Sequence, residues 1–205
     1  MTHKFLPLKI KGFSMVEALV AIAVLTIGVI GPLTLLAGAI ANANYAKNQI
    51  TAFFLAQEAQ ELVINQRDQN ILQGKNSGDT TSDNYWLSGH GLRKCVAGGT
   101  DGVCYVDAYK QVKSIPDSTD DNFLACNEGG VPGQCPVLKL DNQGFYGYGE
   151  GIPTIFKRQI EVIPIPPTSP YLSADEREAV VKVTITWNEK SLSRTFTLNS
   201  IIYRY

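Results

Sequence analysis

One carboxylate lies at the front edge of a long apolar segment near the start of the chain. Glu17 directly precedes residues 18–41, which contain no charged residue. As an α-helix this segment would be roughly 36 Å long, enough to cross a bilayer. Because an ionised acid in hydrocarbon costs several kcal/mol, such residues usually have a partner and a function. Glu17 is therefore the first candidate functional residue, and the chemistry it offers is an ion pair.

The residues around Glu17 occur in a fixed order. A basic head with Lys4, Lys9 and Lys11 is followed by Gly12-Phe13, three residues, Glu17 and the apolar run. This order resembles the N-terminus of type IV pilins and pseudopilins, closely over the leader and first helix and in outline beyond. The start is most similar to minor pilins of the pilus modification class. The resemblance implies that a prepilin peptidase cuts between Gly12 and Phe13 and methylates Phe13.

Such a cut would create a positive charge close to Glu17. The new α-amine on Phe13 is mostly protonated at neutral pH, and one helical turn separates it from Glu17. It could pair with Glu17 of its own chain or of a neighbouring subunit. Pairing between subunits would fix their axial register, which is the best-attested use of a buried polar group. The alternative is that Glu17 simply lies at the lipid headgroups.

An ordinary secretory signal is the main alternative for the N-terminus. Ala39-Ile40-Ala41 and Ala41-Asn42-Ala43 resemble small-residue cleavage sites. However, the apolar core of such a signal spans only about 7–15 residues, and an acid fits poorly inside it. We therefore read residues 1–12 as a leader peptide and residues 13–41 as a transmembrane or filament-core helix.

Four cysteines lie beyond the apolar run: Cys95, Cys104, Cys126 and Cys135. An even number on the exported side of a membrane predicts disulfides. Three pairings are possible, and we favour the two sequence-adjacent pairs because each brackets glycine-rich turn residues. Zinc is not expected, since structural zinc ligands normally pair two to four residues apart, and no Cys-x-x-Cys redox motif occurs.

No catalytic constellation is visible in the sequence. It contains no Ser/His/acid set, no phosphate-binding glycine loop and no metal-ligand cluster. We therefore expect a structural protein rather than an enzyme, with no cofactor and no metal. The net charge is −1, and −4 without the leader's three lysines, so general nucleic-acid binding is not expected.

One long helix is expected from Phe13 to about Arg67. Its first half is apolar all round, and Gly28, Gly31 and Pro32 predict a helix break, although membrane helices often tolerate such residues. Over residues 42–67 the helix is amphipathic, with an apolar stripe at spacings of three and four. The stripe consists of Ala52, Leu55, Ala56, Ala59, Leu62 and Val63.

The rest, residues 68–205, is expected to form a globular head with disulfide loops at 95–135. Residues 155–205 alternate in polarity and predict an antiparallel sheet with one apolar face. That face needs a cover, and the helix stripe is the obvious one. The predicted fold class is α+β, pilin-like: a long N-terminal helix packed on a C-terminal antiparallel sheet.

The basic leader should remain cytoplasmic by the positive-inside rule, which sends the head outward into the periplasm. The resemblance implies inner-membrane storage, then incorporation with other pilin subunits into a filament by an inner-membrane assembly platform. The expected function is a minor pilin. The alternatives are a minor pseudopilin of type II secretion and a single-pass membrane protein whose periplasmic head binds a ligand.

Overall fold

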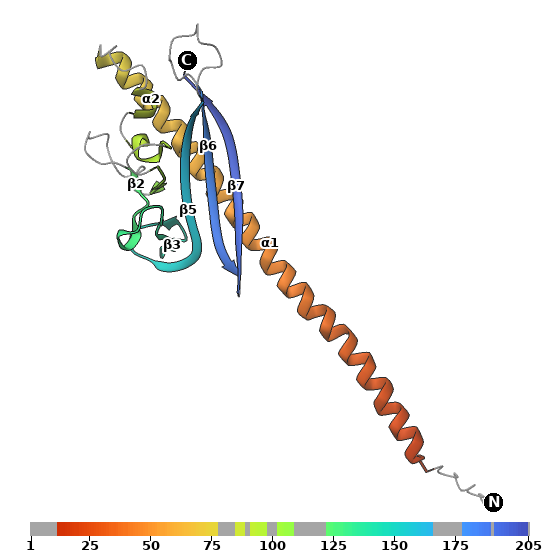
Figure 1. Ribbon diagram of the computed structural model, residues 1–205. Helices are drawn as coiled ribbons and strands as arrows, with labels where there is room; N and C mark the ends of the chain where they lie inside the picture. Colours follow the sequence, from red (N-terminus) through yellow and green to blue (C-terminus); the bar gives the residue numbers. More distant parts are fainter. Residues whose placement is uncertain are drawn as a thin grey trace, which may run out of the picture. The chain divides into compact units, whose positions relative to one another are not determined.

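The computed structural model of the chain describes residues 12–77, 85–88, 91–97, 102–108, 122–165, 178–189 and 191–204 (Figure 1). The chain divides into two compact units, Met1–Lys47 and Asn48–Tyr205. One helix, α1 (Met15–Ser77), contributes residues to both units. The predicted leader, residues 1–12, lies outside the described residues except for Gly12.

In the first unit α1 is apolar on every side. Its leucine, isoleucine and valine side chains are exposed, as Leu19, Ile27 and Leu35 illustrate. The helix begins at Met15, where the N–H of Ala18 donates to the carbonyl of Ser14 at 3.1 Å. Phe13, the expected first helical residue, therefore lies just before the helix.

The structure contradicts the expected helix break at Gly28, Gly31 and Pro32. α1 is continuous through all three residues, with Pro32 inside it. Proline removes the hydrogen bond that its N–H would give to the carbonyl of Gly28, and its ring presses on that carbonyl. On the next turn, the Thr34 hydroxyl donates to the carbonyl of Gly31 at 2.8 Å. One lost bond in a long helix is not enough to interrupt it.

In the second unit α1 continues to Ser77 instead of ending near Arg67. The residues beyond Arg67 are polar, but Asn70 is fully buried. Gln66 donates to the Asn70 side chain at 3.1 Å, and Asn70 donates to the carbonyl of Trp86 at 3.2 Å, in the short helix α2 (Tyr85–Ser88). These hydrogen bonds allow polar residues to occupy a packed helix face.

Among the described residues the sheet has seven strands, and all their pairings are antiparallel. Its centre is β5 (Ile152–Ile165), with β6 (Glu178–Glu189) on one side and β7 (Leu192–Tyr203) beyond β6. The other side of β5 is shared by short strands: β1 (Cys104–Val106) paired with β2 (Phe123–Ala125), and β3 (Val137–Leu140) paired with β4 (Tyr146–Gly147).

The second half of α1 covers one face of this sheet (Figure 1). Ala52, Ala56, Ala59 and Val63 are fully buried in the helix stripe. On β6, alternate residues are buried from Ala179 to Trp187, as the polarity pattern predicted. The predicted α+β fold, a long helix packed on an antiparallel sheet, is confirmed.

Pro164 remains within the sheet and pairs with Ala179 inside β5. Beyond the bridge between Val162 and Val96, β5 has a partner on one side only among the described residues. A proline in such a stretch can direct its nitrogen to the open side without removing a ladder hydrogen bond.

The two disulfides join sequence-adjacent cysteines, the pairs favoured from the sequence. Cys95–Cys104 links the short helix η1 (Leu92–Cys95) to β1, and both cysteines are fully buried. Cys126–Cys135 closes an exposed loop that contains η2 (Glu128–Gly130). The first disulfide is therefore part of the core, and the second lies at the edge of the head.

Candidate processing and assembly site

The bond between Gly12 and Phe13 lies in non-helical backbone directly before α1. Phe13 is 73 % exposed. Exposed irregular segments are where proteases usually cut, because the backbone there is not held by helical hydrogen bonds. The predicted cleavage position therefore lies in an exposed, non-helical segment.

Glu17 lies in the first turn of α1 and is exposed. The free N–H groups of a helix N-terminus favour a carboxylate at this position. Ser14 directly precedes the helix, and the spacing Ser14-x-x-Glu17 is that of a capping box. This second role was missed in the sequence, although the spacing could have revealed it. The helix start can stabilise Glu17 before cleavage, and a Phe13 ammonium could do so afterwards.

The apolar part of α1 is the only segment, among the described residues, that is long and apolar enough to cross a membrane. None of it is buried within the chain. A surface this apolar needs lipid or other subunits around it, because water does not solvate it favourably. This segment fits a membrane anchor.

The second unit contains a buried cation that sequence reasoning missed. Arg158 projects from β5 toward the helix side of the sheet and is fully buried. It contacts the Glu58 carboxylate at 2.5 Å and donates to the carbonyls of Val106 at 2.6 Å and Leu55 at 3.3 Å. Arg158 thereby joins α1, β5 and β1 at one point. A buried guanidinium requires such partners, since an unpaired charge is very costly there.

Tyr148 lies beside this cluster. Its ring centroid is 4.4 Å from that of Tyr105. Burial raises the pKa of Tyr148 to about 12, although the positive charge of Arg158 opposes the shift. Burial and the nearby Asp107 carboxylate also raise the pKa of Tyr105. Both phenols are thus kept neutral in the folded head.

We expect the head to lose stability as the pH rises above 10. Between pH 10 and about 12, Tyr148 stays protonated when folded but ionises when unfolded, so the unfolded state is favoured. The loss from this residue should reach about 2 kcal/mol at pH 12. Ultraviolet titration of phenolate should show a last-titrating tyrosine that disappears in Tyr148→Phe. An unchanged titration curve would contradict the assignment.

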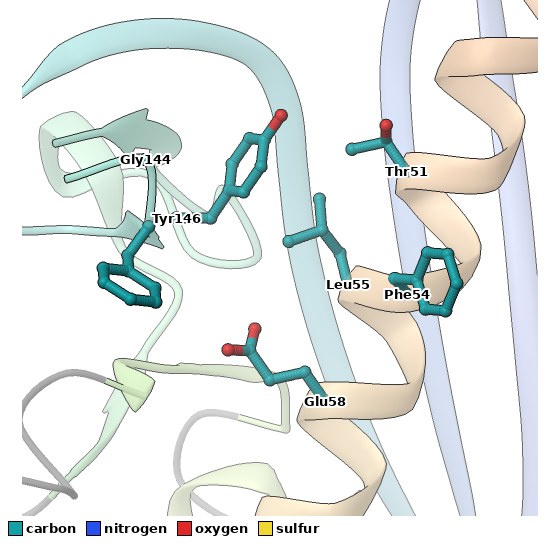
Figure 2. Close-up of a pocket in the computed structure, with 7 residues that line it drawn as sticks. Thr51, Phe54, Leu55, Glu58, Gly144 and Tyr146 are labelled. Carbon is teal, nitrogen blue, oxygen red and sulfur yellow. The ribbon is translucent and has the colours of Figure 1, made fainter. Parts of the chain in front are cut away.

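A groove of about 380 Å³ lies between α1 and residues 144–146, both within the second unit (Figure 2). Figure 2 shows Leu55 and Glu58 projecting from α1 toward the segment with Gly144 and Tyr146. The rings of Phe54 and Phe145, which also line it, are 62 % and 61 % exposed. The lining residues include no nucleophile–base pair, and the carboxylate of Glu58 is held by Arg158. The exposed rings and apolar lining suit a contact surface.

No group of three or more His, Cys, Asp or Glu residues that could hold a metal ion occurs in the part of the chain that the structure describes. All four cysteines are in disulfides. The chemistry that the described residues offer is therefore ion pairing and packing.

Residues 8–31 match the family model for the prokaryotic N-terminal methylation motif. The match covers Gly12, Phe13, Glu17 and the first part of the apolar helix. No curated protein and no solved structure matches the chain. This motif, at the start of a long apolar helix whose second half packs on an antiparallel sheet, supports a protein of the type IV pilin-like kind, a pilin or pseudopilin precursor.

Proposed function

We propose that the chain is a minor pilin of the type IV pilus. It is inserted in the inner membrane with its N-terminus in the cytoplasm and its head in the periplasm. Prepilin peptidase cuts between Gly12 and Phe13, and Phe13 is then methylated. The assembly platform extracts the mature subunit into a filament with other pilins, either within the shaft or as part of a priming complex.

The observation that supports this proposal most is the position of Glu17. It is the one acid before a continuous stretch of exposed apolar helix. Once such helices pack together, the α-amine of a neighbouring Phe13 is the natural partner for its carboxylate. That pairing sets the axial register, while residues 18–41 supply the apolar contacts. Subunits related in this way add head to tail without closing a ring.

Glu17→Gln should leave cleavage intact and remove the protein from filaments. The amide keeps the size of the side chain but cannot form the ion pair with the Phe13 ammonium. Mass spectrometry of the membrane fraction should show a chain that starts at methylated Phe13 in both forms. The amount in sheared filaments should fall strongly only in the variant.

Asn44→Ala provides the matched control, since it removes an exposed polar side chain farther along the same helix and leaves Ser14 and Glu17 in place. A mature chain that starts anywhere other than Phe13 would refute the proposal. So would normal incorporation of Glu17→Gln.

The Gly12, Phe13 and Glu17 motif is equally compatible with a pseudopilin of type II secretion, in which the same cleavage and ion pair would operate. Deleting the gene separates the two systems. We expect loss of pili and of twitching with normal protein secretion. The opposite result would identify a pseudopilin.

A further inference from the structure

The groove between α1 and residues 144–146 carries a carboxylate and, among the described residues that line it, no cationic side chain. Its lining includes three aromatic rings and one acid, from Phe54, Phe145, Tyr146 and Glu58. Its volume of about 380 Å³ lies within the range of small-ligand sites. An apolar groove with a single carboxylate suits a ligand that combines an apolar stem with a positive charge.

The carboxylate of Glu58 has one oxygen left for a ligand. Arg158 contacts Oε2, and within the part of the chain that the structure describes this is the carboxylate's only polar contact. The Glu58 side chain is 39 % exposed, and Figure 2 shows it projecting from α1 toward the segment that carries Tyr146. The second oxygen, Oε1, can therefore accept a hydrogen bond from a bound group.

The charges beside the groove also favour a cation. A second carboxylate, that of Asp107, is buried close to Gly147, where an added Cβ would meet its Oδ1 at 3.4 Å. Burial raises the pKa of Tyr148, and the charges of Arg158 and Asp107 act on it in opposite directions, so both lie near this ring. Two carboxylates, from Glu58 and Asp107, thus surround one guanidinium. The excess negative charge attracts a cationic ligand and repels an anionic one.

The aromatic side of the groove is fixed before any ligand arrives. One carboxylate oxygen of Asp141 accepts hydrogen bonds from the N–H groups of Gln143 at 2.9 Å and Phe145 at 2.8 Å. The Asp141 N–H donates to the carbonyl of Phe145 at 3.0 Å. The ring of Phe145 is thus held exposed on a closed turn, and the Tyr146 ring meets Phe156 edge-on at a centroid distance of 6.2 Å. Rings that are already ordered lose little entropy when a ligand binds.

We propose that this groove binds the guanidinium group of an arginine residue within a polypeptide. The planar cation stacks against the exposed aromatic rings and donates to Oε1 of Glu58, while its aliphatic stem lies along Leu55. A lysine ammonium fits less well, because it is strongly hydrated and needs more acceptors than the groove offers. Free arginine also fits less well, since no cation among the described lining residues can hold its α-carboxylate.

The test is a fluorine NMR titration of the full chain in nanodiscs of zwitterionic lipid, with 4-fluorophenylalanine in place of Phe54. The probe is N-acetylarginine amide, and the matched ligand control is its neutral isostere, N-acetylcitrulline amide. We expect the arginine probe to shift the fluorine signal saturably at roughly millimolar concentration. The citrulline probe should bind at least about fivefold more weakly, because it lacks the charge that the rings and Glu58 recognise. N-acetyllysine amide and free arginine should also bind more weakly than the arginine probe.

A substitution in the groove gives a second readout. Phe145→Leu keeps an apolar side chain but removes a ring, and should weaken binding of the arginine probe about fivefold. Ile201→Leu, at an exposed position on β7 outside the groove, should leave the affinity unchanged. Glu58 is kept intact, because its substitution would also remove the partner of Arg158. An unchanged affinity in Phe145→Leu, no saturable shift, or binding of any other probe as tight as that of N-acetylarginine amide would overturn the proposal.

Discussion

Replacing Arg158 by methionine should lower the free energy of unfolding of the head by about 3 kcal/mol. The apolar side chain has a similar length, so little cavity is expected. However, the buried carbonyl of Val106 loses its 2.6 Å hydrogen bond, and Glu58 loses its cationic partner. Most of the loss comes from the carbonyl, because the Glu58 side chain is 39 % exposed and water can solvate it.

Denaturant unfolding of the full chain in detergent measures this effect. Both tryptophans, Trp86 and Trp187, are buried in the head, so their fluorescence reports its unfolding. Lys157→Met is the matched control on the same strand, since its ion pair with Glu128 at 3.4 Å is exposed. It should change stability by less than about 0.5 kcal/mol. Equal effects of the two substitutions would show that the Arg158 contacts contribute nothing specific.

Removing the Cys95–Cys104 disulfide by a double substitution to alanine should destabilise the head by about 3–4 kcal/mol. Two terms contribute to this loss. The unfolded chain regains the entropy of an open loop, and the missing sulfur atoms leave space in the core. Both cysteines are fully buried among the core residues.

The Cys126–Cys135 disulfide separates these two terms. Its sequence separation is also 9, so the loop-entropy term should be the same. Its loop is exposed, and its cysteines, although buried at 2 % and 5 % exposure, do not belong to the core cluster. The corresponding double alanine variant should therefore lose only about 2–3 kcal/mol. A larger loss there than at Cys95–Cys104 would contradict the core assignment of the first disulfide.

The parts of the fold with regular polarity could be predicted from the sequence. The stripe from Ala52 to Val63 and the alternation along β6 each repeat a local period, so one chain segment is enough to recognise them. The strands β1–β4 could not be recognised in this way. They have two to four residues, too few for an alternation, and exist because β5 offers them a long edge.

Arg158 shows why the buried cluster was not predicted. It occupies the inward position between Phe156 and Ile160, where alternation requires an apolar residue. Its acceptors come from α1 and β1, far away in the chain. In the sequence, Arg158 is a charged residue at a position where the alternating pattern predicts a buried apolar side chain. Its hydrogen-bond partners become visible only in the tertiary structure. The motif of Gly12, Phe13 and Glu17 could be recognised from the sequence, because it depends only on the order and spacing of neighbouring residues.

The separation of 100 residues between Glu58 and Arg158 has a consequence for how the molecule is made. A ribosome releases α1 first, with its apolar stripe uncovered, and β5 to β7 only much later. The loops closed by the disulfides are local and can form early, whereas the apolar stripe of α1 can be buried only after β5 to β7 have been synthesised. Contacts between residues so far apart in the chain slow folding and prolong the exposure of aggregation-prone apolar surface. The nascent head should therefore depend on a chaperone or on the membrane until translation of β7 is complete.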